Sequence, residues 1–141
     1  MVDSDVIQRR LTALEEYISD LEKARKDKCW EEFASDKIFR RYVERTLHMA
    51  VEACLDIANY IISYEGYREP KDNKDSFEVL KEQNIITNVL NTQLKKMAQF
   101  RNIIVHDYLR IQPEIVYAIL KKNIPDIINF AKRIKDNYLS F

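Results

Sequence analysis

Apolar side chains recur every three or four positions through most of the chain, which is the period of an amphipathic α-helix. The first stripe spans residues 4–26 and consists of Ile7, Leu11, Leu14, Ile18 and Leu21. Further helices are predicted over residues 35–64, 76–83, 88–108 and 113–138. Long amphipathic helices joined by short connections predict an up-and-down antiparallel bundle of four to five helices. The predicted fold class is therefore all-α.

Three further features of the pattern refine this prediction. Residues 66–76 contain the one glycine, a proline and a cluster of charges, so we expect a loop there. Pro125 interrupts the last helical segment and is expected to kink or split it. The apolar stripe of segment 35–64 is wide enough to cover nearly half of a helix. Such a helix is either central in a bundle or in contact with both the core and a partner.

Composition also favours helices alone. The chain has one glycine and three prolines among 141 residues, too few for the turns of an all-β fold or for a glycine-rich phosphate loop. A chain of this length is expected to form a single domain, residues 1–141. Cys29 and Cys54 lie far apart and lack the spacing of a zinc site or a disulfide framework.

The charge balance argues against strong long-range attraction to nucleic acid or to an anionic membrane. Lys and Arg together number 23, and Asp and Glu together also number 23, so contact with RNA requires a local basic patch. Charged residues occur throughout the start of the chain, which predicts no signal peptide. No apolar run approaches the ~18 residues that a membrane span needs. We therefore expect a cytoplasmic protein with no membrane partner.

The segment 88–108 places a charged residue within its own apolar stripe. At about 100° per residue, Arg101 falls at the centre of that stripe. Burial of an unpaired guanidinium is costly, so this position requires a partner or a cleft. Asn102 and His106 are four residues apart and therefore neighbours on the adjoining helix face. The run RNIIVHDY thus gathers Arg101, Asn102, His106 and Tyr108 within two turns.

These types of side chain suit cleavage of RNA with no metal ion and no cofactor. Arg101 can neutralise a phosphate and His106 can move a proton near neutral pH, so a 2′-hydroxyl could attack the adjacent phosphate. The same residues could instead form a hydrogen-bonded polar patch at a dimer interface. The other histidine, His48, lies between Glu44 and Glu52 at four-residue spacing, which is typical of a solvated helix edge.

The eight residues RNIIVHDY resemble the Arg-(four residues)-His-x-Tyr motif of HEPN-domain toxins of the HepT type. The similarity extends to KKMAQFRNIIVHDYLRIQPEIVYAIL around the motif, to ERTLHMAVEACLDIANYII in the long second segment and to DSFEVLKEQNII before the motif helix. It runs from about Val6 to Tyr138. The chain is thus similar to these toxins over nearly its whole length, as a single HEPN-like helical domain.

The resemblance implies an all-α homodimer whose two motif helices form a shared ribonuclease cleft. It implies that Arg101 and His106 are catalytic and that Asn102 supports them. It also implies a toxin–antitoxin pair, in which a cognate MntA-type nucleotidyltransferase antitoxin silences the toxin by transferring AMP to Tyr108. The alternative is a non-catalytic helical module that docks a minimal nucleotidyltransferase or a nucleotide.

The residues themselves also favour a homodimer, packed through segment 88–108 and part of segment 35–64. Arg101 is centred in an apolar stripe, and segment 35–64 is too broadly apolar for one core. A lone helix pair cannot form a cleft for a phosphate, whereas a two-fold axis doubles each Arg, Asn and His.

Overall fold

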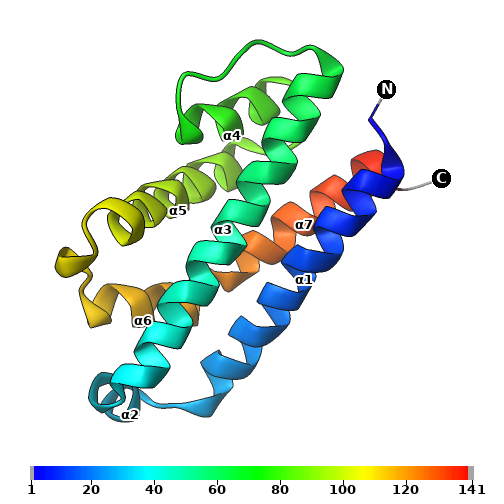
Figure 1. The fold of residues 1–141 in the computed structure, drawn as a ribbon. Coiled ribbons are helices and arrows are strands. Elements are labelled where there is room, and N and C mark those ends of the chain that lie inside the picture. Colours follow the sequence, from blue (N-terminus) through cyan, green and yellow to red (C-terminus); the bar gives the residue numbers. More distant parts are fainter. Residues whose placement is uncertain (1, 140–141) are drawn as a thin grey trace.

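The computed structural model describes residues 2–139, which form a bundle of helices (Figure 1). Its elements are α1 (Ser4–Asp27), α2 (Trp30–Ser35), α3 (Lys37–Glu65), α4 (Asn73–Glu82), α5 (Asn88–His106), the 3₁₀ turn η1 (Tyr108–Arg110), α6 (Pro113–Lys122) and α7 (Ile124–Tyr138). No strand occurs within residues 2–139, so the predicted all-α fold is confirmed. Among the described helices, none combines the length and the hydropathy that a membrane-spanning segment requires.

The five predicted helical segments are present, with two additions. The short helix α2 lies between the predicted segments 4–26 and 35–64. Its Phe33 is fully buried and anchors it to the core, with its ring centroid 5.2 Å from that of Tyr117 in α6. The last predicted segment is split at Asn123 into α6 and α7, as expected from Pro125, which lies at the start of α7. The described chain therefore has seven α-helices rather than four or five.

The long helix α3 is the centre of the bundle. It packs against each of the other six α-helices of the described chain, and it crosses the middle of the molecule in Figure 1. Eleven of its residues are buried, which accounts for the breadth of its apolar stripe. The inference that this breadth indicates contact with a partner is therefore corrected, because the chain's own core covers the stripe.

Local side chains set the helix ends that position the site. The carboxylate of Asp36 accepts from the backbone N–H of Phe39 at 3.0 Å and caps the start of α3. Gly66 ends α3 with φ of 68°, a left-handed conformation that glycine adopts without strain. The hydroxyl of Thr87 accepts from the backbone N–H of Leu90 at 3.1 Å at the start of α5. These contacts fix both ends of α3 and the start of α5.

The predicted loop 66–76 is shorter than expected, because α4 begins at Asn73. Arg68 fastens this loop to α4: its guanidinium donates to both carboxylate oxygens of Asp75, at 2.7 and 2.8 Å, and to Glu82 at 2.8 and 2.9 Å. These contacts hold the pKa of the Asp75 carboxyl well below its usual range. The loop is thus joined to α4 by paired charges, while Tyr67 packs against the hydrophobic core.

The helix α5 ends at His106, two residues earlier than predicted. Asp107 leaves the helical conformation, with φ of −148° and ψ of 45°, and Tyr108 begins the turn η1. The prediction that one helix runs from residue 88 to residue 108, and so includes Tyr108, is therefore wrong at its end. From η1 the chain turns into α6, whose first residue is Pro113.

Candidate active site

The predicted site residues lie at the C-terminal end of α5 and in η1. Arg101 and Asn102 are half-buried, whereas His106 is exposed in the last turn of α5. Tyr108 is 61% exposed. Nη1 of Arg101 donates to Oδ1 of Asn102 at 3.1 Å. Among the described residues, no hydrogen bond joins His106 or Tyr108 to Arg101, so only Arg101 and Asn102 are directly linked.

Arg101 finds its partner on the central helix. Its side chain is 19% exposed and emerges from the buried stripe that includes Leu94, Met97 and Ala98. Nε of Arg101 donates to Oε1 of Glu52 in α3 and forms an ion pair with it. Of the two alternatives that the sequence left open for Arg101, a partner or a cleft, the structure shows a partner, Glu52.

His48 lies in the same cluster, one helical turn before Glu52. Its side chain is 16% exposed, so the expected solvated position is wrong. Nε2 of His48 lies 3.9 Å from Oε1 of Glu52, and its Nδ1 lies 3.2 Å from Nη1 of Arg45. Burial lowers the pKa of His48 below its ordinary value, and the nearby Glu52 carboxylate opposes that shift. Arg101, Glu52 and His48 therefore form one polar cluster between α5 and α3, with the Arg101–Glu52 ion pair at its centre.

Glu52 and His48 were not among the predicted site residues. Helical periodicity identifies the face that each residue occupies on its own helix, but not the helix that packs on that face. The available signal was Glu52 itself, a carboxylate at the margin of the wide apolar stripe of α3. A charge at such a margin contacts whatever element covers the stripe there, which in this chain is α5.

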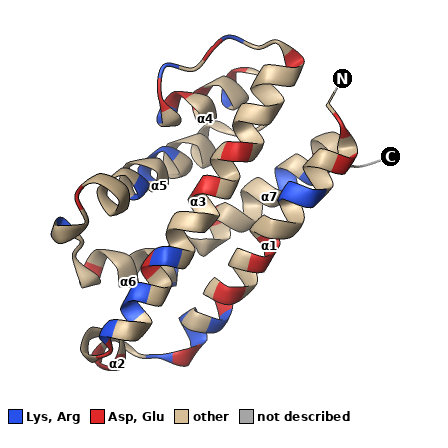
Figure 2. Cartoon of the chain, viewed as in Figure 1, with Lys and Arg blue, Asp and Glu red and all other residues tan. Residues whose placement is uncertain are grey.

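Exposed cations lie on both sides of the motif. Lys96 is exposed on α5, and Arg110 in η1 is exposed and pairs with Asp107 at 3.2 Å. Lys95 is instead held by Glu78 of α4. Figure 2 shows basic residues along the first turns of α3 and acidic residues at its middle, consistent with the position of Glu52. The molecule thus has a few local cations near the motif rather than one basic face.

Exposed apolar side chains lie within the motif and directly after it. Ile103, Val105, Leu109 and Ile115 are 40%, 39%, 85% and 45% exposed. Between α5 and α6 lies a groove of about 310 Å³, whose lining includes Phe100, Ile103 and Ile115. A concentration of exposed apolar side chains around polar residues is typical of an interaction surface.

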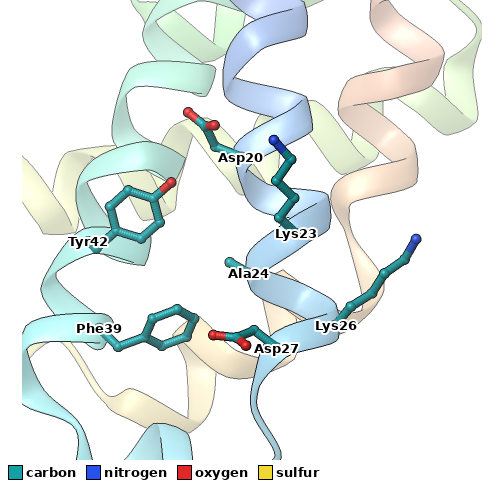
Figure 3. A pocket seen from close by; sticks show the side chains of 7 residues that line it. All are labelled: Asp20, Lys23, Ala24, Lys26, Asp27, Phe39 and Tyr42. Carbon is teal, nitrogen blue, oxygen red and sulfur yellow. The ribbon is translucent and has the colours of Figure 1, made fainter.

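The hollow drawn in Figure 3 is a separate feature. It measures about 500 Å³ and lies between the end of α1 and the start of α3, where Phe39 lies opposite Asp27 and Tyr42 opposite Asp20. None of the predicted site residues lines it. Within residues 2–139, no group of three or more His, Cys, Asp or Glu side chains is arranged to hold a metal ion. The candidate active site is therefore the group of motif residues at the end of α5 and in η1, namely Arg101, Asn102, His106 and Tyr108.

Comparison with known proteins assigns the fold to a family. A family model described as Ribonuclease HepT-like matches residues 14–134. The chain belongs to the HepT-like ribonuclease family. It is 32% identical over 132 residues to the mRNA nuclease HepT of Shewanella oneidensis, covering 94% of this chain and 98% of that protein. The tRNA nuclease HepT of Aphanizomenon flos-aquae is 26% identical over 119 residues, or 84% of this chain and 80% of that relative.

Solved structures agree with this assignment. A structure of the tri-AMPylated Shewanella oneidensis HEPN toxin in complex with MNT antitoxin matches with a TM-score of 0.85 and 32% identity, covering 94% of this chain and 98% of the toxin chain. A crystal structure of a toxin–antitoxin with AMP-PNP matches with a TM-score of 0.86 and 31% identity, with the same coverage of both chains. The predictions of a HEPN-type helical fold and of a ribonuclease of the toxin–antitoxin class are confirmed.

Proposed function

We propose that this chain is the toxin of a toxin–antitoxin pair and cuts RNA in the cytoplasm, with Arg101 and His106 as its catalytic residues. The observation that carries the proposal is the arrangement at the end of α5. Arg101 is held in place beneath the surface by Glu52 and Asn102, whereas His106 is exposed one turn further along. A fixed cation beside an exposed proton carrier, in a family of ribonucleases, is suited to attack on a phosphodiester.

The proposed reaction is transesterification within the RNA strand. The 2′-oxygen attacks the adjacent phosphorus and forms a new P–O bond, while the bond from phosphorus to the 5′-oxygen breaks. One imidazole takes the proton of the 2′-hydroxyl, and a second gives a proton to the departing 5′-oxygen. Arg101 offsets the charge that builds on the phosphorane oxygens, and Asn102 supports the guanidinium. The products are a 2′,3′-cyclic phosphate and a 5′-hydroxyl.

A homodimer supplies the second imidazole. The chain has two histidines, and His48 is largely covered and faces Glu52, so a second exposed histidine has to come from another copy. The exposed apolar side chains around the motif, with Leu109 at 85%, provide a surface for that copy. A two-fold axis near the end of α5 brings both copies of Arg101 and His106 to one cleft. The proposed dimer interface therefore includes the exposed side chains of η1 and α6 as well as those of α5.

Tyr108 is the proposed site of AMP transfer by an MntA-type nucleotidyltransferase antitoxin. Its side chain is 61% exposed, and η1 places it just past His106. In the transfer, the phenol oxygen attacks the α-phosphorus of ATP and pyrophosphate leaves. Attachment of AMP adds a phosphate and a bulky nucleoside beside the cleft, where they compete with RNA for Arg101 and block access. Support comes from relatives solved as an AMPylated toxin and with an antitoxin.

The proposal is tested by incubating purified protein with RNA in the presence of EDTA. The wild-type protein should cut and leave 2′,3′-cyclic phosphate ends, and His106→Ala, purified in parallel, should cut ~10²–10⁴-fold more slowly. Arg101→Ala should be similarly impaired, since the charge on the phosphorane then has no fixed cation. A His106→Ala protein as active as wild type, or cleavage that disappears with EDTA, would contradict the mechanism.

A further inference from the structure

We infer that Glu52 is a positioning residue of the active site, which fixes the guanidinium of Arg101 so that its outer edge faces the phosphate; this inference rests on the proposed function. Glu52 lies 49 residues before Arg101 and on a different helix, so only the packing of α3 against α5 brings the two together. No motif of the sequence marks Glu52 as part of the site.

The hydrogen bonds of Arg101 define which of its donors are free. A guanidinium has five N–H groups, one on Nε and two on each terminal nitrogen. Glu52 takes the Nε–H, and Asn102 takes one N–H of Nη1 at 3.1 Å. Both N–H groups of Nη2 and the second N–H of Nη1 have no hydrogen-bond partner among the described residues. A phosphate therefore meets the Nη1–Nη2 edge, which can donate to two of its oxygens at once.

The surroundings of Glu52 explain why it holds Arg101 firmly. Its side chain is 30% exposed and that of Arg101 is 19% exposed, so both charges are partly withdrawn from water. The imidazole of His48 lies beside the same carboxylate, with its Nε2 3.9 Å from Oε1 of Glu52. On the other side, Glu52 lines a shallow hollow of about 130 Å³ between α1 and α3, together with Arg10 and Asp56. The carboxylate thus lies where α1, α3 and α5 meet, with part of its side chain still open to solvent.

The location of the ion pair is also informative. Glu52 binds Nε, the nitrogen nearest the chain, rather than the terminal nitrogens that a phosphate uses. A carboxylate on the terminal edge would compete with RNA, whereas one on Nε orients the group and leaves that edge available. An arginine without this contact samples many rotamers, whereas one fixed by Glu52 keeps its terminal edge aligned with the phosphate while charge builds on the phosphorane oxygens. We therefore expect Glu52 to act on the rate of the chemical step more than on RNA binding.

Three substitutions separate positioning from simple charge balance. Glu52→Ala removes the acceptor. Glu52→Gln removes the charge but keeps an amide oxygen that can accept from Nε–H. Glu44→Gln is the matched control, because Glu44 lies two turns earlier on α3 and its carboxylate forms no ion pair among the described residues. If Glu52→Ala does not fold, Glu52→Asp takes its place, since it withdraws the carboxylate by one methylene group.

Two measurements are made on each protein. The first is NMR of arginine labelled with ¹⁵N, which reports exchange of the Arg101 Nε–H. In Glu52→Ala, exchange of the Arg101 Nε–H should be at least about tenfold faster, because its acceptor is gone, while Glu52→Gln and Glu44→Gln should resemble wild type. An Arg101 signal that is unchanged in Glu52→Ala would overturn the inference, whether or not the protein cleaves RNA.

The second measurement is the rate of RNA cleavage at saturating and at low substrate. In Glu52→Ala, kcat should fall about 10–100-fold while KM stays nearly constant, and Glu52→Gln should recover most of kcat. Glu52→Gln as slow as Glu52→Ala, or Glu52→Ala at the wild-type rate, contradicts the positioning role. Absence of cleavage by the wild-type protein contradicts the proposed function instead. In that case the NMR measurement alone tests whether Glu52 fixes the guanidinium of Arg101.

Discussion

The predicted homodimer can be tested at one side chain, because Leu109 is 85% exposed beside the motif. Full burial of a leucine contributes about 1.5–3 kcal/mol. A two-fold dimer contains two copies of Leu109, so Leu109→Ser should weaken association by about 3–6 kcal/mol. At about 1.4 kcal/mol per tenfold change, the dimer dissociation constant should rise by ~10²–10⁴.

Val89 provides the matched control for this substitution. It is 75% exposed and lies in the first turn of the same helix, α5, about 25 Å from His106 at the rise of an α-helix. Val89→Ser removes a comparable exposed apolar side chain but should leave the dissociation constant unchanged. Sedimentation velocity over a wide range of protein concentrations measures the constant for all three proteins. Thermal unfolding shows whether each variant is folded.

Cleavage activity supplies an independent readout of the same prediction. If the cleft needs both copies of His106, the activity of Leu109→Ser per chain should fall on dilution, in parallel with its dimer fraction. The reasoning is refuted if wild-type protein is monomeric at the concentrations where it cuts RNA. It is also refuted if Val89→Ser dissociates the dimer and Leu109→Ser does not, since the interface then lies at the other end of α5.

Three further predictions follow from single side chains. Tyr108→Phe should gain no AMP mass when incubated with the cognate nucleotidyltransferase and ATP, and should still cut RNA; AMP transfer to the variant would place the modification elsewhere. Hydrogen bonds from the side chains of Lys95, Asn91 and Lys81 lower the pKa of Glu78 to about 2. That stabilisation is complete above the ordinary carboxyl pKa and is lost as pH falls through about 2, so Glu78→Gln should cost about 1 kcal/mol in urea unfolding at neutral pH and progressively less as pH falls toward 2. Burial raises the pKa of the Cys54 thiol, whereas Cys29 is exposed. A thiol reagent should therefore modify Cys29 alone in the folded protein and both cysteines after unfolding.

Helix positions could be predicted because their signals are local. The stripe of apolar residues, the scarcity of glycine and the position of Pro125 all act within a few residues of where they occur. The same locality limits the prediction of helix ends. The helix α5 stops at His106 rather than at Tyr108 because the chain must turn through η1 to bring α6 onto the bundle, and Ile111 and Val116 pack against the core there. The helices against which α6 packs include α1 and α3, which are distant in sequence from α5.

The requirement that Arg101 have a partner or a cleft follows from the sequence alone, because a guanidinium in an apolar stripe is costly wherever the helix packs. The identity of the partner does not follow, since Glu52 is 49 residues away and many carboxylates could pack there equally well. The position of His48 was mistaken for the same reason. Its neighbours on α3 are charged, but α5 covers that edge. Local periodicity assigns each residue to a face of its own helix, and only the packing of helices decides which faces meet.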